Sequence, residues 1–230
     1  MGRRNIRGSS TKTQEETFVK PLTPKNSAQE FYMNMMKEST VTFGLGPAGT
    51  GKTFIACHSA LQDLKNGVVD KIVLTRPVIA TEDFGYLPGD LHEKIHPFLM
   101  PLFDAIEDHL GVTRAKLLLA SNAVEILPLA FMRGRSLNRC IMILDEAQNT
   151  TIDQMKMFLT RIGYGSKMII TGDLGQSDLH GSSENGLRWA TRKLTGSSSE
   201  ISVMEFNSRH IVRNPLIEKM LQYLEGPDKK

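Results

Sequence analysis

Six short apolar runs recur along this sequence, and longer segments with a helical pattern separate them. The runs occupy 40–45, 71–75, 123–127, 140–144, 167–171 and 201–206, and the helical patterns occupy 26–37, 52–65, 90–120 with interruptions, 151–162, 184–194 and 215–224. Short, nearly continuous apolar strands that alternate with helices are typical of a parallel sheet covered on both faces. The pattern therefore predicts an α/β fold of three layers, α/β/α, with a mainly parallel sheet.

Size and composition fit one large domain. The chain has 230 residues, of which 40% are hydrophobic and 23% charged, enough to bury a core without disulfides. Cys57 and Cys140 stand in no C-x-x-C pair, which argues against a thiolate zinc site and suits a reducing cytoplasm. No apolar run reaches membrane-spanning length, so we expect a cytoplasmic protein without a membrane partner.

Charge is concentrated at the N-terminus. Residues 1–20 are polar and carry Arg3, Arg4 and Arg7, which predicts a disordered basic tail ahead of a single domain over 21–230. An arm that touches RNA is the alternative. The net charge of +3 permits a nucleic-acid partner and does not require one.

Residues 46–53 match the phosphate-loop pattern G-x-x-x-x-G-K-[ST], directly after a predicted strand and at the start of a predicted helix. Such a loop aims backbone N–H groups and a helix N-terminus at phosphate. We expect Lys52 to contact the β- and γ-phosphates and Thr53 to bind Mg²⁺. The predicted ATP-binding residues of the loop are Gly46, Pro47, Ala48, Gly49, Thr50, Gly51, Lys52 and Thr53.

Two further polar groups follow apolar strands. Asp145 and Glu146 end the run at 140–144, where open α/β sheets place ligands, so we expect Asp145 to hold Mg²⁺ and Glu146 to act as the base that orients water. Asp173 and Gln176 follow the run at 167–171, where a sensor of the γ-phosphate is expected. A solvated strand end and a glycine-built turn are the respective alternatives.

Gln29 precedes the phosphate loop by a helix and a strand. Its amide offers a donor and an acceptor, which suits paired hydrogen bonds to adenine. An exposed helix residue without a role is the alternative reading.

Residues 92–96 read H-E-K-I-H, a zinc-protease pattern that needs both histidines on one helix face. Pro97 follows directly, and the residue before proline is pushed out of helical geometry. We therefore expect the helix to begin near Pro97 and the histidine pair to be incidental.

Together these stretches resemble the PhoH family of phosphate-loop ATPases. The matching stretches are GLGPAGTGKT (44–53), TRPVIATEDFGYLPGDLHEKIHPFLMPLFDAI (75–106), LPLAFMRGRSLNRCIMILDEAQNTT (127–151), TGDLGQSDL (171–179) and HIVRNPLI (210–217). The resemblance implies a RecA/helicase-like core related to superfamily-one helicases, with an insertion at about 76–110. It also implies ATP binding, a role coupled to RNA and a hexameric ring.

A single core lacks the second domain that closes a monomeric helicase site. Because an arginine supplied in trans accelerates phosphoryl transfer strongly, we expect a homo-oligomer whose neighbour completes the site. Candidate fingers are Arg213 and Arg209, with Arg133 and Arg135 as a second possibility or as nucleic-acid contacts.

Two functions remain open at this point. One is an ATPase coupled to RNA or single-stranded DNA. The other is an ATP-dependent switch that docks a protein through the mixed apolar and acidic segment 76–110.

Overall fold

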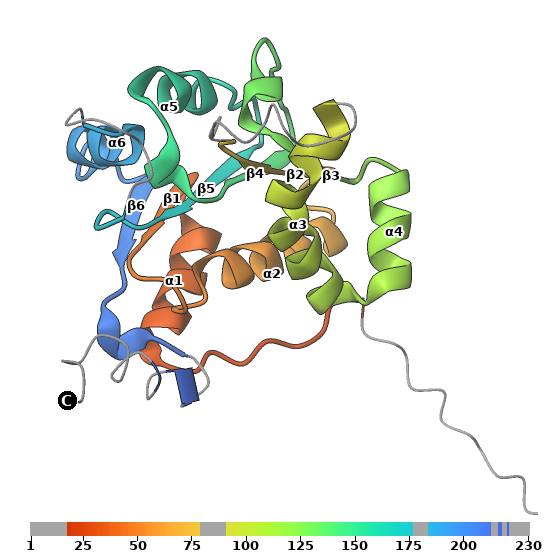
Figure 1. Ribbon diagram of the computed structural model, residues 1–230, viewed down its shortest axis with the longest axis horizontal. Coiled ribbons are helices and arrows are strands. Elements are labelled where there is room, and N and C mark those ends of the chain that lie inside the picture. Colours follow the sequence, from red (N-terminus) through yellow and green to blue (C-terminus); the bar gives the residue numbers. More distant parts are fainter. Residues whose placement is uncertain (1–17, 79–90, 177–183, 213–215, 218–219, 221–230) are drawn as a thin grey trace, which may run out of the picture.

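The structure is a computed structural model that describes residues 18–78, 91–176, 184–212, 216–217 and 220, with only the backbone for 91–95 (Figure 1). Its centre is a six-stranded, all-parallel sheet in the order β3-β2-β4-β5-β1-β6. The strands are β1 (Val41–Leu45), β2 (Lys71–Arg76), β3 (Val124–Pro128), β4 (Cys140–Leu144), β5 (Lys167–Gly172) and β6 (Ile201–Glu205). The predicted α/β fold with a parallel sheet is confirmed.

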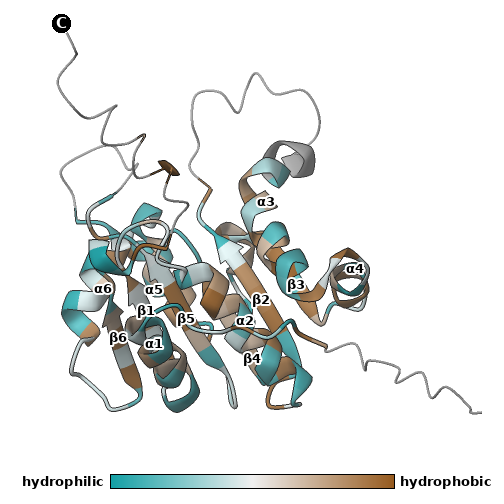
Figure 2. Cartoon of the chain, turned by 90° about the horizontal axis from the view of Figure 1, so that it is seen from below, coloured by the Kyte–Doolittle hydropathy of each residue, from teal (hydrophilic) through white to brown (hydrophobic). Residues whose placement is uncertain are grey.

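Helices cover both faces of this sheet, with α1 to α4 on one face and α5 and α6 on the other (Figure 1). The helices are α1 (Ser27–Glu38), α2 (Lys52–Lys65), α3 (Leu91–Leu110), α4 (Val112–Ala120), α5 (Ile152–Leu159) and α6 (Gly186–Leu194), with short 3-10 turns η2 (Leu129–Met132), η3 (Ala147–Asn149) and η4 (Ser208–His210). Figure 2 shows hydrophobic colour along the inner strands and hydrophilic colour on the outer sides of α1 and α6. Within the described ranges, no helix combines the length and apolar character needed to cross a membrane.

The alternation of side chains along β4 explains the two cores. Ile141 and Ile143 pack with the α1 to α4 layer, whereas Met142 and Leu144 pack with the layer of α5 and α6. Every residue of β4 is buried, as expected for a central parallel strand covered on both faces.

Our expectation that a helix begins near Pro97 is wrong. Helix α3 begins at Leu91 and continues through Pro97 and Pro101. Three side chains of its later part, Leu99, Leu102 and Ile106, are buried in the core. This packing against the sheet outweighs the local preference of the prolines, so most of the predicted segment 76–110 that the structure describes forms a crossover helix.

Residues 18–20, the last three of the expected tail, belong to the described part of the chain. Val19 is 3% exposed, and the Lys20 N–H donates to the His109 carbonyl over 2.9 Å. Residues 1–17, and most of the helix predicted at 215–224, lie outside the described residues.

Candidate nucleotide site

A cavity of about 250 Å³ opens at the carboxyl ends of the strands. The connections that leave the neighbouring strands β1 and β5 run to opposite sides of the sheet, which makes this edge a switch point of the kind where open α/β sheets bind ligands. The lining residues are Ala48, Gly49, Gly51, Lys52, Thr53, Phe54, Asp145, Glu146, Gly172, Asp173 and Gln176.

The loop after β1 needs glycine for two separate reasons. Gly46 has φ of 132°, and a Cβ at this position would lie 2.3 Å from the Phe206 carbonyl oxygen. Gly51 has φ of 86° and is the N-cap residue of α2. Because glycine has no side chain to cap the helix, no capping group from residue 51 occupies the first N–H groups of α2. The Gly46 N–H donates to the Gly172 carbonyl over 3.0 Å and joins the loop to β5.

Lys52 and Thr50 hold the loop from inside. Lys52 Nζ donates to the carbonyl oxygens of Gly46 (2.6 Å) and Pro47 (2.9 Å). Thr50 is fully buried and donates from Oγ1 to the same Pro47 carbonyl over 3.0 Å. The structure therefore places Thr50 as a support of the loop, and Lys52 Nζ against the Gly46 and Pro47 carbonyls of the loop.

Gln29 lies beneath this loop, 5% exposed. Its Nε2 donates to the Thr50 carbonyl over 2.9 Å, and its Oε1 accepts from the Lys25 N–H over 2.8 Å. These bonds use one of its two amide hydrogens and one of its two acceptor positions. The predicted adenine contact stays a prediction, and a second role, support of the loop, comes from the structure alone.

Two hydroxyls converge on one carboxylate oxygen. Asp145 Oδ1 accepts from Thr53 Oγ1 over 2.6 Å and from Thr171 Oγ1 over 2.7 Å, and Asp145 is 6% exposed. Hydroxyl and carboxylate oxygens are the ligands that Mg²⁺ prefers. The donor set brought together by α2 and β4 therefore fits the expected ion, and Asp145 and Thr53 are the residues that could hold it.

Glu146 has a backbone conformation that is unusual for a residue with a side chain. Its φ and ψ of 52° and 42° are left-handed, which is costly outside glycine and recurs at functional sites. One carboxylate oxygen, Oε1, lies 3.5 Å from Arg76 Nη2, and the other, Oε2, accepts from Gln148 Nε2. The predicted base is thus held at the cavity between two side chains.

Gln148 connects this carboxylate with the turn after β5. It is 3% exposed, and its Oε1 accepts from the Asp173 N–H over 3.0 Å. Asp173 Oδ1 in turn accepts from the Gly175 N–H over 2.8 Å, so the Asp173 carboxylate also builds the turn. Asp173 and Gln176 both line the cavity, as a sensor of the terminal phosphate would.

The predicted arginines lie in different surroundings. Arg213 lies outside the described residues, and Arg209 is exposed in η4 and does not line the cavity. Arg135 donates twice to Glu125, over 3.0 and 2.7 Å, and this guanidinium, followed by Lys71, lowers the pKa of Glu125 below its usual value. Arg133 is exposed.

Only one histidine of the H-E-x-x-H pattern has a described side chain. His96 is exposed and stacks on Phe103 at 5.4 Å, while the side chains of 92 and 93 lie outside the described part. His109 Nε2 lies 2.8 Å from the Phe54 carbonyl and must donate to it, because a carbonyl only accepts. In the described ranges no group of three His, Cys, Asp or Glu side chains is placed to hold a metal ion.

His58 and His109 form a buried pair below the cavity. Their ring centroids are 5.2 Å apart, and Phe54, which lines the cavity, packs on His109 at 4.0 Å. Burial, and secondly the neighbouring His109, lower the pKa of His58 to about 4. Burial also lowers the pKa of His109, although its bond to the Phe54 carbonyl opposes this.

Three residues of the site were missing from the sequence prediction: Arg76, Gln148 and Thr171. Arg76 and Thr171 lie at or next to the carboxyl ends of β2 and β5, and Gln148 lies two residues beyond Glu146. Inspection of every polar residue at a predicted strand end could have found Arg76 and Thr171. Gln148 has no such signal, because its role depends on a tertiary bond to the turn after β5.

Comparison with known proteins points to one family. The family model for PhoH-like proteins matches residues 21–225. A PhoH-like protein of Bacillus subtilis (strain 168) is 50% identical over 204 residues, which are 88% of this chain and 64% of that protein. Protein PhoH of Escherichia coli (strain K12) is 38% identical over 87% of this chain and 57% of its own length.

Among solved structures, the Pif1 helicase from Candida albicans aligns with 87% of this chain and 44% of that chain, at 14% identity and a TM-score of 0.43, too distant to carry an argument. The chain spans about 57–64% of the length of the two curated relatives. Since the family model covers almost the whole sequence and the loop, the acidic strand end and the sheet agree with it, the chain belongs to the PhoH-like protein family.

Proposed function

We propose that this protein binds ATP and hydrolyses it. The observation that carries the proposal is the convergence of Thr53 and Asp145, 2.6 Å apart, at a cavity that Glu146 and the glycine-rich loop also line. A phosphate-binding loop alone would suit many nucleotide-binding proteins. The addition of the Glu146 carboxylate, next to Asp145 after the end of β4 and on a strained backbone, favours hydrolysis over binding alone.

Each residue has a distinct part in the proposed reaction. The loop amides and the N-terminus of α2 bind the phosphates, and Lys52 exchanges its two carbonyl partners for phosphate oxygens. Thr53 and Asp145 would hold Mg²⁺, which neutralises phosphate charge when bound. Glu146 orients the attacking water and takes its proton, and Gln176 contacts the terminal phosphate from the turn after β5.

The proposed site is completed by a second copy of the chain. Among the residues that the structure describes, Lys52 is the only cation that lines the cavity. Developing charge on the transferred phosphoryl group calls for a further cation, and an arginine in trans can supply it. Arg213 and Arg209 are our candidates, in a homo-oligomer that the family resemblance makes a hexameric ring.

We further propose that hydrolysis is coupled to RNA or single-stranded DNA. The helicase-like family resemblance supports this partner, and the net charge of +3 permits it. The rival is a switch that docks a protein through 76–110. Leu99, Leu102 and Ile106 of that segment are buried in the core and are not part of such a surface, whereas Phe98 and Phe103 are half-buried and 79–90 lie outside the described residues.

The deciding experiment measures ATP hydrolysis by the full chain, sized by light scattering, with and without poly(U) and poly(dT). We expect turnover that either polymer stimulates. Lys52→Ala should abolish ATP binding and serves as the control for contaminating ATPases. Binding of ATP without turnover rejects hydrolysis, and turnover that neither polymer changes rejects the nucleic-acid partner and favours the protein switch.

A further inference from the structure

Arg76 lies at the end of β2, beside the acidic strand end. Strands β2 and β4 pair in parallel, with Thr75 opposite Leu144, and the Asp145 N–H donates to the Thr75 carbonyl over 2.9 Å. This register places the start of the Arg76 side chain next to Asp145 and Glu146. Its Nη2 lies 3.5 Å from Glu146 Oε1.

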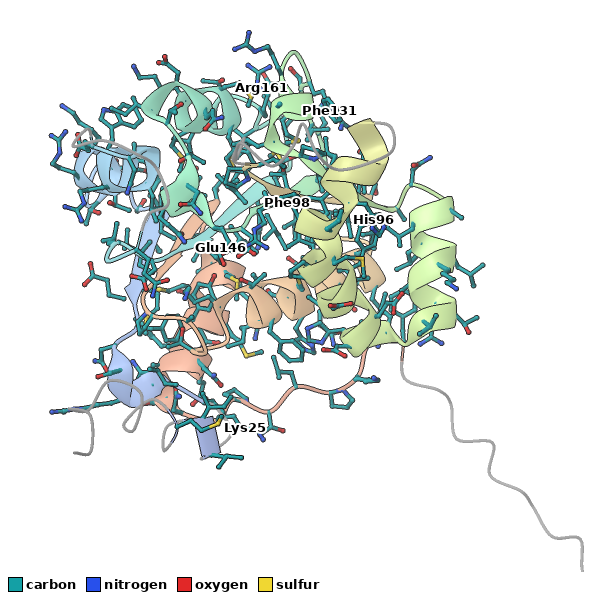
Figure 3. All side chains as sticks on the ribbon, in the orientation of Figure 1. Lys25, His96, Phe98, Phe131, Glu146 and Arg161 are labelled. Atoms are coloured by element: carbon teal, nitrogen blue, oxygen red, sulfur yellow. The ribbon has the colours of Figure 1, made fainter. Side chains whose placement is uncertain are left out.

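The same guanidinium also contacts α3. Arg76 Nη1 lies 3.4 Å from the carbonyl oxygen of Phe98, and Figure 3 labels Phe98 on α3 and Glu146 near the centre of the molecule. Pro101 lacks the N–H that would bond the Pro97 carbonyl, so the helical ladder of α3 is interrupted one residue from Phe98. Arg76 is thus the side chain that touches both Glu146 and a weakened turn of α3.

We propose that Arg76 is a positioning residue that ties Glu146 to α3 and holds its carboxylate back from the attacking water until α3 shifts, an inference that rests on the proposed hydrolysis of ATP. With Gln148 on Oε2 and Arg76 on Oε1, both oxygens of the carboxylate are engaged. Gln148 is buried and connects Glu146 to the turn after β5, whereas Arg76 connects Glu146 to α3.

The ion pair between Arg76 and Glu146 is weak enough to shift the position of the Glu146 carboxylate without locking it. The side chains of Arg76 and Glu146 are 24% and 38% exposed, and an ion pair of this length and exposure shifts an equilibrium by about five-fold at most. A general base contributes about 10²- to 10⁴-fold. Loss of Arg76 should therefore change the rate several-fold, far less than loss of Glu146.

The test compares steady-state ATP hydrolysis by Arg76→Gln, Arg76→Lys, Glu146→Gln and the Arg76→Gln/Glu146→Gln double variant. We expect Arg76→Gln to raise kcat about two- to five-fold without a change in KM for ATP. Arg76→Lys keeps the charge and should stay near the wild-type rate. The double variant should be as slow as Glu146→Gln alone, because the gain passes through that carboxylate.

Arg139→Gln is the matched control. Arg139 forms an exposed pair with Asp70 at the opposite end of β4, so its loss should leave kcat and KM unchanged. A purely structural role of Arg76 predicts a lower Tm and a lower kcat in both Arg76 variants. A kcat that falls or stays constant in Arg76→Gln, or a gain that survives in the double variant, overturns the proposal.

Amide hydrogen exchange separates this proposal from the proposed function. Without nucleotide, Arg76→Gln and Glu146→Gln should both speed exchange in the peptide that covers 98–106, and Arg139→Gln should not. If amide exchange in 98–106 is unchanged in Arg76→Gln and Glu146→Gln, the link between Arg76 and α3 is refuted, even when the enzyme hydrolyses ATP. A wild-type chain that binds ATP without turnover rejects the proposed function and the part of Arg76 in hydrolysis.

Discussion

Thr53 and Asp145, 92 positions apart in the sequence, are joined by a hydrogen bond of 2.6 Å between Oγ1 and Oδ1. The bond brings the first turn of α2 to the end of β4. Thr171 donates to the same oxygen from β5, so helix α2, strand β5 and the end of β4 meet at one carboxylate.

The Thr53 hydroxyl can be tested by paired substitutions. Thr53→Ser keeps the hydroxyl and should retain the Mg²⁺ dependence of hydrolysis. Thr53→Ala should raise the Mg²⁺ concentration for half-maximal rate about ten-fold or more. A Mg²⁺ titration of kcat measures both, and equal midpoints in the two variants would remove Thr53 from the metal site.

Glu146→Gln should separate binding from turnover. The amide keeps the size of the side chain and loses the ability to take a proton, so kcat should fall by about 10²- to 10⁴-fold. ATP affinity, measured by calorimetry, should stay within a few-fold of wild type. Loss of binding in this variant would indicate that Glu146 holds the loop in place.

Gly46→Ala tests the fit between the phosphate loop and the segment after β6. The added Cβ would meet the Phe206 carbonyl oxygen at 2.3 Å and should lower the free energy of unfolding by more than about 3 kcal/mol. Gly67→Ala is the matched control, because Gly67 also has positive φ, 69°, and has nothing within 4 Å of the new Cβ. The control should lose only about 1–2 kcal/mol of backbone strain, as measured by urea unfolding.

The trans arginine can be tested by mixing subunits. Arg213→Ala should keep ATP binding and lose about 10³-fold or more in kcat. Mixing it with Lys52→Ala subunits should restore part of the activity, since sites then form that have a functional loop from one copy and an arginine from the next. Arg209→Ala undergoes the same assay, and normal turnover by both arginine variants would exclude both as fingers.

The buried histidine pair predicts a dependence of stability on pH. The pKa of His58 is about 4 in the folded state and near 6.5 in the unfolded chain, so the unfolded state binds more protons between these values. The contribution of neutral His58 to stability is therefore fully present above about pH 6.5. It decreases by roughly 2 kcal/mol by pH 5 and by roughly 3 kcal/mol at pH 4. Urea unfolding at pH 7 and pH 5 measures this loss, and His58→Leu should have a smaller loss; an equal loss would assign it to other groups.

Sequence patterns were sufficient for the sheet and for the contacts that follow from strand ends. The six apolar runs coincide with the six strands to within one or two residues, because central parallel strands are apolar on both faces. Asp145, Glu146 and Lys52 could be placed at one edge since parallel strands end together.

Contacts set by tertiary packing could not be predicted. The bond from Gln148 to the Asp173 N–H joins residues 25 apart through a turn whose shape depends on Gly175. Helix α3 begins six residues before Pro97 because buried Leu99 and Leu102 fix it against the sheet, which a local rule about proline does not include. The pairing of Arg76 with Glu146 needs the register of β2 against β4.

The neighbours of β1 set the order in which the protein can mature on the ribosome. β1 pairs only with β5 and β6, and β5 begins at Lys167, about 120 residues after β1. At usual rates of synthesis, β1 emerges roughly 6 to 25 s before its first partner strand. A nascent chain that already carries the complete loop at 46–53 therefore still lacks Gly172 and Asp173, which line the proposed nucleotide site.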